Sequence, residues 1–539
     1  MKNFIVRGAT VLSLSATALV VAPSCTKDLD RTPIYDLSTN AVYKDAAGYK
    51  AMLAKIYGGF ALTGSKGPAG DDQTKDIKGI DEGTSDYIRQ YWSAQELTTD
   101  EGVIAWGDPG IQDWHNMNWT PSGVLIRGLY SRLMYEVTIC NSFIAEATDT
   151  KVSGRGLSGA DAANITAFRA EARFLRALAY YHALDLYGNV PFADETFQIG
   201  GTALPSRISR ADLFAYLEKE LKDMDSGLVA PRANEYGRAD KAAAWALLAK
   251  MYLNAEVYLG PGKGRYADAA TYAKKVIDAG YALTPKYGNL FLADNDKNNP
   301  EVIFPIVFDG KNTQSYGGTT FLTHAAVSGT ADANWNPAYY GLGGGWGGSR
   351  TTTNLFRQFP DTASDSRGRF HTAGQTMDIT SLTDFKYGYV PIKFRNVTST
   401  GMPGSDNTFV DADFPMFRLA DMYLTYAEAA LRGGGDQGLA LTYVNLVRTR
   451  AYRGSTAGNI TAANLTLPFL LNERSRELFW EATRRTDLIR YNLFTSGTYV
   501  WPWKGGTAAG KGVADNLSLF PIPSSELSIN SNLTQNTGY

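Results

Sequence analysis

Pairs of amphipathic helices rich in Ala and Tyr constrain the fold of this chain more than any other feature. Residues 238–259 place small and apolar side chains at helical spacing, and residues 265–279 repeat the pattern after a Gly/Pro turn. Ala at a helix contact lets two backbones approach closely, and Tyr fills the remaining gaps. A pair of this kind, about 40 residues long, is typical of a tetratricopeptide hairpin. Residues 416–432 and 437–451 form a second such pair.

Further helices are predicted at 166–187, 209–224 and 467–494. Gly188 and Pro191 end the first of these, and Ser209 with Asp212 caps the start of the second. Charged side chains in the third recur three and four residues apart. We therefore expect them to pair with one another or to cap neighbouring helices, which is a structural role.

Two long stretches, 61–122 and 281–413, lack helical periodicity. Segments of this length in a compact protein are usually functional or contain small elements of their own. Because helical repeats do not cap themselves, we expect the two stretches to cover one end or one face of the scaffold. The chain is therefore predicted to be mostly α, with helical hairpins and long irregular loop excursions.

The N-terminus has the pattern of a secretory signal. Lys2 and Arg7 supply positive charge, Gly8–Ala22 is uncharged and mostly apolar, and small residues follow. The apolar run is shorter than the roughly 20 residues that a membrane-spanning helix needs. Cys25 stands where cleavage is expected, which resembles the bacterial lipobox, whose cysteine is acylated and becomes the new N-terminus. Residues 1–24 are thus predicted to be a lipoprotein signal peptide, and Cys25 the lipidation site.

Two other interpretations of Cys25 remain open at this point. The protein could be secreted without an anchor, with Cys25 present by chance. Cys25 could also form a disulfide with Cys140, although the patterns around the two cysteines give no sign that they are close. An acylated Cys25 would hold the protein at a membrane, since several acyl chains anchor a protein stably.

Charge and motifs exclude several classes of function. Lys and Arg total 52 against 54 Asp and Glu, a net charge of −2 that becomes −4 when Lys2 and Arg7 leave with the signal. This balance argues against nucleic-acid binding.

The four His residues form no local metal motif, and no G-x-S-x-G or H-E-x-x-H is present. Residues 505–512 imitate a phosphate-binding loop, but Gly512 replaces the required Ser or Thr. We expect no enzyme activity, no cofactor and no metal.

Several motifs taken together resemble the SusD/RagB family of the Bacteroidota. They are "EARFLRALAYYHALDLYGNVPF" (171–192), "GRADKAAAWALLAKMYL" (237–253), "FPMFRLADMYLTYAEAAL" (414–431), "LNERSRELFWEATRRTDLIRYN" (471–492) and "LFPIPSSELSINSNLTQNTGY" (519–539). "ELTTDEGVI" (96–104) also fits. These motifs cover the chain in family order.

The resemblance implies a fold, a location and a partner. It implies four tetratricopeptide-like hairpins in a right-handed scaffold, and an outer-membrane lipoprotein facing the cell exterior. It implies binding of an oligosaccharide that is passed to a SusC-like TonB-dependent transporter. It also divides the chain into a signal peptide (1–24), a lipidated tether (25–40), an N-terminal part with helical hairpins (41–280) and a C-terminal part with the loop-rich insertion and further hairpins (281–539).

Other binding functions are compatible with the same scaffold. The chain could be the peptide- or glycopeptide-binding component of a similar importer. It could also be a tetratricopeptide scaffold that binds peptides in a concave groove and exposes few Trp residues.

A sugar site needs a flat aromatic side chain for the C–H face of the ring and polar side chains for its hydroxyl groups. Two loop clusters provide both kinds of residue. The first contains Trp106, Asp108, Trp114, His115 and Asn116, and the second contains Trp335, Tyr339, Tyr340, Trp346 and Arg350. Glycines around Trp346 give the backbone freedom to bring the rings to a surface. The alternative is that the aromatic residues fix long loops to the body. Trp501 and Trp503 form a third candidate.

Overall fold

The computed structural model describes residues 39–539 except 66, 68–73, 199–200, 298 and 331. The predicted signal peptide and Cys25 lie outside the described residues. Cys140 is a buried free thiol. None of the described helices is both long enough and apolar enough to cross a membrane.

Helices make up most of the regular structure, and short strands account for little of it. The longer helices, of eight residues or more, are α2 (Ala46–Gly59), α4 (Tyr87–Glu96), α6 (Val124–Glu146), α8 (Gly159–Leu186), α9 (Arg210–Asp223), α10 (Lys241–Leu253), α12 (Tyr266–Ile277), α13 (Gly318–Ala325), α15 (Leu419–Ala429), α16 (Gln437–Ala451) and α17 (Leu467–Leu478). The shorter helices are α1 (Thr39–Val42), α3 (Glu82–Ser85), α5 (Asp113–Asn116), α7 (Asp149–Gly154), α11 (Ala255–Leu259), α14 (Thr353–Arg357), α18 (Arg484–Arg490) and α19 (Ser524–Ile529).

Six short strands form three two-stranded antiparallel ladders among the described residues. The ladders pair β1 (Gly102–Ile104) with β3 (Ser349–Thr351), β2 (Val302–Ile306) with β6 (Phe414–Arg418), and β4 (Phe370–His371) with β5 (Val390–Pro391). Each ladder joins segments that are distant in sequence.

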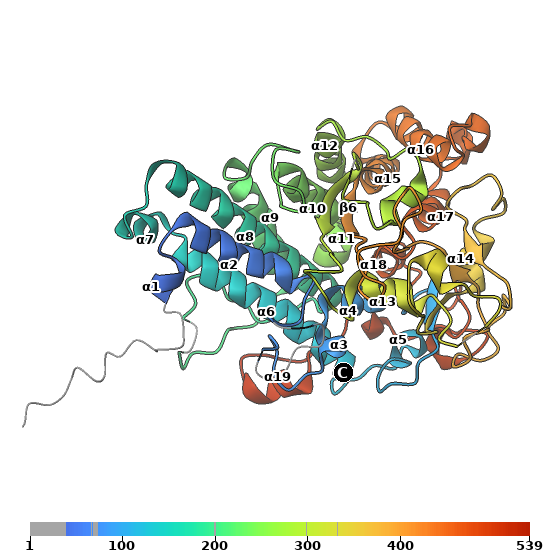
Figure 1. Cartoon of the computed structure of the whole chain (residues 1–539), viewed down its shortest axis with the longest axis horizontal. Coiled ribbons are helices and arrows are strands. Elements are labelled where there is room, and N and C mark those ends of the chain that lie inside the picture. The colour runs from blue at the N-terminus through green and yellow to red at the C-terminus, as the bar shows by residue number, and fades with distance from the viewer. Residues whose placement is uncertain (1–38, 66, 68–73, 199–200, 298, 331) are drawn as a thin grey trace, which may run out of the picture.

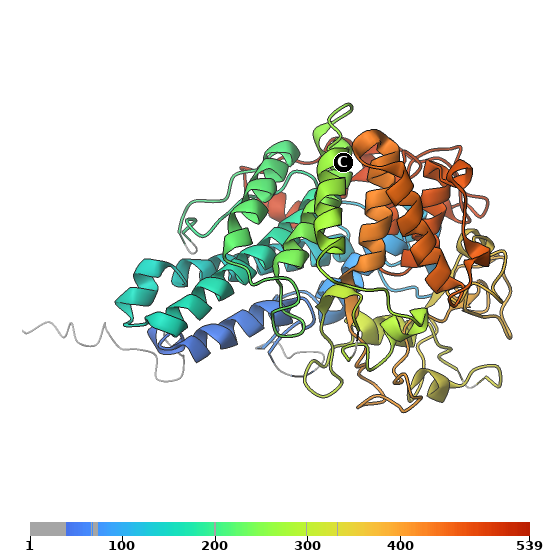
Figure 2. The same ribbon diagram turned by 90° about the horizontal axis from the view of Figure 1, so that it is seen from above.

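The helices pack in a series, in which each helix contacts the next one across the molecule. Along this series α6 and α2 pack on α8, α8 on α9, α10 on α12, α12 on α15 and α15 on α16. Figures 1 and 2 show the series running from the N-terminal helices at one end, through α10 and α12, to α15–α17. The loop-rich segment around α13 and α14 lies beside the C-terminal helices. The prediction of helical hairpins with long loop excursions is confirmed.

Several predicted helix boundaries are wrong. Residues 416–418 belong to strand β6, because they pair with β2 before α15 begins. The stretch 238–259 is divided into α10 and α11 at Asn254. The stretch 467–494 is interrupted between α17 and α18, where Trp480 and Ala482 adopt positive φ angles that a helix does not allow. The stretch 61–122 contains small elements of its own, α3, α4, α5 and β1, which is one of the outcomes expected for a stretch of this length.

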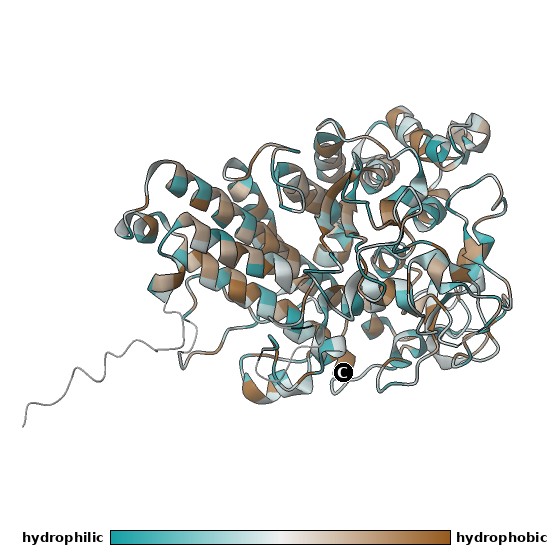
Figure 3. Cartoon of the chain, in the orientation of Figure 1, coloured by the Kyte–Doolittle hydropathy of each residue, from teal (hydrophilic) through white to brown (hydrophobic). Residues whose placement is uncertain are grey.

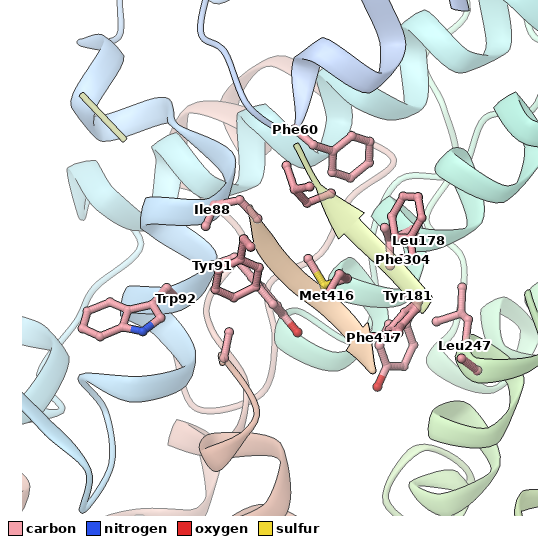
Figure 4. Close-up of a cluster of buried hydrophobic side chains, with 14 of the residues drawn as sticks. Phe60, Ile88, Tyr91, Trp92, Leu178, Tyr181, Leu247, Phe304, Met416 and Phe417 are labelled. Atoms are coloured by element: carbon pink, nitrogen blue, oxygen red, sulfur yellow. The ribbon is translucent and has the colours of Figure 1, made fainter. Parts of the chain in front are cut away.

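The main core lies where the helices meet the β2–β6 ladder. Phe304 of β2 lies beside Leu178 of α8, Phe417 of β6 is buried in the same cluster, and Tyr91 and Trp92 of α4 lie on the other side (Figure 4). The long helices carry hydrophobic and hydrophilic residues in alternating bands (Figure 3). The apolar faces of these helices therefore pack together in a continuous core.

Glu136 on α6 is an exception to the pairing of buried charges. Its side chain is fully buried, and among the described residues neither carboxyl oxygen has a hydrogen-bond partner. A guanidinium nitrogen of Arg132 is 4.0 Å from Oε1. A Cβ atom on Gly59 would lie 1.9 Å from Glu136 Oε1, so glycine is required there. Burial raises the pKa of Glu136 from 4.5 to about 8.

This pKa makes the stability of the protein depend on pH. The unfolded chain releases the Glu136 proton near pH 4.5 and the folded chain near pH 8, so the free energy of unfolding falls as pH rises between these values. We expect Glu136→Gln to remove this fall and to be more stable than the wild type at pH 8.5, on the order of 2–4 kcal/mol. Urea unfolding at pH 5 and pH 8.5 measures the difference. An unchanged pH dependence in the variant would contradict the assignment.

Candidate ligand-binding site

The β1–β3 ladder brings the two predicted aromatic clusters together. Gly102 pairs with Thr351 and Ile104 with Ser349. The ladder continues beyond Ile104, where the Ala105 amide donates to the Gly348 carbonyl at 2.9 Å. The residues that follow β1 and precede β3 therefore lie side by side.

Trp106 and Trp346 are the neighbours that this ladder creates. The Trp106 indole Nε1–H donates to the Trp346 carbonyl at 3.0 Å, and the ring centroids are 6.4 Å apart with planes inclined by 46°. A Cβ atom on Gly348 would lie 2.7 Å from the Trp106 ring, so only glycine allows this packing. Both indoles are half-buried, and each keeps part of its surface in solvent.

Helix α13 supports Trp346 from behind. The His324 ring stacks on the Trp346 ring at 4.5 Å with planes 19° apart, and the Trp346 amide donates to the His324 carbonyl at 2.9 Å. His324 Nε2 donates to the Thr408 carbonyl at 2.8 Å. Burial lowers the pKa of His324, so the ring is neutral at pH 7. His324 therefore contacts both the backbone and the ring of Trp346 and fixes its orientation.

Tyr316 extends the row of rings. Its centroid lies 6.3 Å from that of Trp346, with planes inclined by 58°, and 5.4 Å from that of Phe409. The Tyr316 side chain is among the more exposed large hydrophobic groups, at 37%. Trp106, Trp346 and Tyr316 thus form a row of three inclined rings, called the aromatic arc below.

Arg89 on α4 adds a positive charge beside the arc. Its guanidinium carbon lies 4.8 Å from the Phe321 ring centroid and 5.5 Å from that of Trp106. Among the described residues, the guanidinium has no hydrogen-bond or ion-pair partner. Burial lowers the pKa of Arg89, and Asp86 and Asp108 are among the acidic groups that oppose this fall. Arg89 therefore stays charged and keeps its donors available.

Asp86 fixes two parts of the site at once. It is the N-cap of α4, and its Oδ1 accepts from the Arg89 amide at 2.8 Å and from the Gly318 amide at 3.1 Å. Its Oδ2 accepts from the Ser315 hydroxyl at 3.0 Å. One buried carboxylate thus holds the helix that carries Arg89 and the turn that carries Tyr316.

Five residues that we expected to contact a ligand are buried in the structure. They are Trp114 (1% exposed), His115 (0%), Trp335 (8%), Tyr340 (2%) and Arg350 (0%), and the expectation that they stand on an exposed surface is wrong. Trp114 packs 5.4 Å from Phe520 and fixes the C-terminal segment. Arg350 donates to the carbonyls of Gly348, Leu382, Asp384 and Tyr387, so it ties together the backbone of one loop.

His115 has an indirect connection to the arc. His115 Nε2 is 2.9 Å from the Gln112 amide oxygen, and Gln112 Nε2 donates to the carbonyls of Ile104 and Trp106. Burial lowers the pKa of His115 to about 3, so the imidazole is neutral. A neutral imidazole can donate to Gln112 through Nε2–H, which orients the amide toward Trp106.

The remaining predicted residues lie apart from the arc or beside it. Asp108 is exposed, close enough to Arg89 for an electrostatic interaction. Asn116 lies next to Gly506. Trp335 is 8% exposed and stacks on His371 at 3.6 Å. Tyr339 and Tyr340 form a separate group, with their ring centroids 5.1 Å apart. Of the third candidate pair, Trp501 is buried, and Trp503 donates from its indole to the Ile379 carbonyl.

Sequence reasoning missed Tyr316 and Arg89. Tyr316 precedes Gly317 and Gly318, and this is the same combination of an aromatic residue and glycines that marked Trp346. That signal could have identified it. Arg89 lies within "YIRQYW", in a stretch that showed no helical periodicity, and no local signal distinguishes it from the other arginines.

Comparison with known proteins agrees with this architecture. A model described as the SusD family matches residues 361–539. The starch-binding protein SusD of Bacteroides thetaiotaomicron is 34% identical over 96% of both chains, and a SusD-like protein of Bacteroides ovatus is 25% identical over 89% of this chain and 82% of its own.

Solved structures share the fold. A SusD superfamily protein from Bacteroides thetaiotaomicron superposes with a TM-score of 0.69 at 20% identity, covering 91% of this chain and 99% of its own. Surface glycan-binding protein A of the same organism, in complex with laminarihexaose, superposes with a TM-score of 0.68 at 19% identity, covering 91% and 99%. The predicted mostly α, tetratricopeptide-like fold is confirmed. The chain therefore belongs to the SusD family, a family of binding proteins rather than enzymes.

Proposed function

We propose that this protein is a cell-surface lipoprotein that binds oligosaccharides on the aromatic arc and passes them to a TonB-dependent outer-membrane transporter. The observation that carries the proposal is the row of three inclined rings beside the guanidinium of Arg89, which has no partner among the described residues. The rings offer flat apolar faces to pyranose C–H groups, and Arg89 and Asp108 offer polar groups to the hydroxyls. The starch-binding and laminarihexaose-bound relatives support a glycan as ligand.

The shape of the arc favours a curved glucan. The planes of Trp106 and Tyr316 are inclined by 46° and 58° to that of Trp346, so the three rings do not form one flat surface. An α-1,4-linked glucan winds as it extends and can follow inclined rings, whereas a β-1,4-linked glucan is straight and flat. We therefore infer that starch-type oligosaccharides bind better than cellulose-type ones. The alternative ligand is a peptide or glycopeptide.

Titration calorimetry with maltohexaose, laminarihexaose, cellohexaose and a peptide mixture tests the proposal. We expect maltohexaose to bind more tightly than cellohexaose. Trp106→Ala and Trp346→Ala should each weaken maltohexaose binding about tenfold or more, because each removes a stacking surface. Trp503→Ala is the control, since Trp503 lies outside the arc. Peptide binding without glycan binding, or wild-type affinity in both arc variants, would refute the glycan site.

Asp86 should be required for affinity although it does not belong to the arc. Asp86→Ala removes the acceptor for the Arg89 and Gly318 amides, and we expect maltohexaose affinity to fall about tenfold together with a loss of about 1 kcal/mol in stability. Asp86→Asn keeps one carbonyl oxygen in place and should recover most of the affinity. If Asp86→Asn binds maltohexaose as weakly as Asp86→Ala while both remain folded, the affinity does not depend on the hydrogen bonds that Asp86 accepts from the Arg89 and Gly318 amides.

Attachment to the membrane is proposed from the sequence around Cys25. Cys25 and the following "TKDLD" supply an acylation site and a hydrated tether. We expect cells fed labelled palmitate to label the wild-type protein and not Cys25→Ala, and we expect the variant to be released into the medium. Label in the variant, or none in the wild type, would show that Cys25 is not the anchor.

A further inference from the structure

Two arginine side chains meet around Tyr339, which follows the loop-rich segment after α13. The guanidinium carbon of Arg395 lies 3.8 Å from the Tyr339 ring centroid, and its Nε donates to the Tyr339 carbonyl at 2.9 Å. Arg369 Nη2 donates to the Tyr339 hydroxyl at 2.5 Å. The β4–β5 ladder sets this geometry, because Arg369 directly precedes β4 and its carbonyl accepts from the Ile392 amide at 2.9 Å.

In the part of the chain that the structure describes, the arginine pair Arg369 and Arg395 has no counter-charge. Among the described residues no carboxylate lies within ion-pair distance of either guanidinium, and Arg369 Nε, Arg369 Nη1 and Arg395 Nη1 have no hydrogen-bond partner. The neighbouring Arg367 is the opposite case, since it pairs with Asp365, Glu473 and Glu477. Two like charges held close together without an anion repel each other, so binding an anion between them would be favourable.

The Tyr340 hydroxyl provides a second, independent observation. Tyr340 is 2% exposed, and its hydroxyl has no hydrogen-bond partner among the described residues. The Tyr340 ring lies 5.1 Å from the Tyr339 ring, which both arginine side chains contact. Burial raises the pKa of Tyr340 above its usual range, and the charges of Arg395 and Arg369 oppose this rise. A buried O–H donor without an acceptor is costly, and a bound acceptor would satisfy it.

From this geometry we propose that Tyr339, Tyr340, Arg369 and Arg395 form a binding site for an oxyanion, such as the carboxylate or sulfate group of an acidic saccharide or a free inorganic ion. The two N–H groups of a guanidinium fork match a pair of oxygens on a planar carboxylate or a tetrahedral sulfate and form strong charge-assisted hydrogen bonds with them. The Tyr340 hydroxyl supplies a further donor, and the Tyr339 ring, 38% exposed, supplies an apolar surface. None of the four residues belongs to the aromatic arc, so the site is distinct from the proposed neutral-glycan site.

Titration calorimetry of the full mature chain tests this site. The probes are sodium glucuronate and sodium sulfate, with glucose and sodium chloride as controls at constant ionic strength. We expect saturable binding of glucuronate, weakened about tenfold or more in the double variant Arg369→Gln/Arg395→Gln and severalfold in Tyr340→Phe. Arg357→Gln, which removes an exposed arginine outside the pair, should bind as the wild type does.

The outcomes separate the two sources of the anion. Binding of both sulfate and glucuronate supports a general oxyanion site, and binding of glucuronate alone supports an acidic-saccharide site. No saturable binding of either anion, wild-type binding in the double variant, or an equal loss in Arg357→Gln would overturn the proposal. Maltohexaose affinity should be unchanged in all three variants, and each variant should unfold in one cooperative thermal transition with a midpoint within a few degrees of the wild type. The midpoint reports folding even if maltohexaose does not bind, so failure of this site and failure of the aromatic arc are distinguishable.

Discussion

The pairing of β1 with β3 is the interaction on which the candidate site depends. This ladder joins a segment near the start of the chain to one far along it, and the backbone hydrogen bonds continue until Trp106 and Trp346 are adjacent. Glycine at position 348 leaves room for the Trp106 indole. A strand pair of three residues is not stable by itself, so the surrounding helices must hold both segments in register.

Buried ion pairs provide that support. Arg484 of α18 donates from Nε to Asp100 at 2.7 Å, and Ser475 of α17 donates to Glu101, directly before β1. On the other side of α17, Glu477 accepts from Arg418 at 2.6 Å, which joins the same helix to β6. Removing one partner of such a pair leaves a buried charge and costs about 3–5 kcal/mol. The C-terminal helices therefore position the loops that form the site.

The sequence predicted the helical hairpins well where apolar spacing was regular and the ends carried capping residues. α9 and α16 lie almost where the pattern placed them, since Ser209 and Asp436 cap their first turns. The errors occur where tertiary contacts override local preference. Residues 416–418 have apolar character that suits a helix, but hydrogen bonds to β2 make them a strand. α4 and β1 were not predicted, because both are short and α4 buries polar residues such as Gln90, Ser93 and Glu96 together with its apolar ones.

The sequence by itself determined the helical scaffold, the family resemblance and the supply of aromatic residues on Gly-rich loops, because spacing and residue type are local properties. Only the tertiary structure decided which aromatic residues meet. It placed Trp106, Trp346 and Tyr316 in one arc and buried Trp114, His115 and Arg350. The side chains of Trp106 and Trp114 have the same chemistry and lie a few residues apart, but one faces solvent and the other packs on Phe520. Burial depends on contacts between segments that are distant in sequence, and residue type alone carries no information about such contacts.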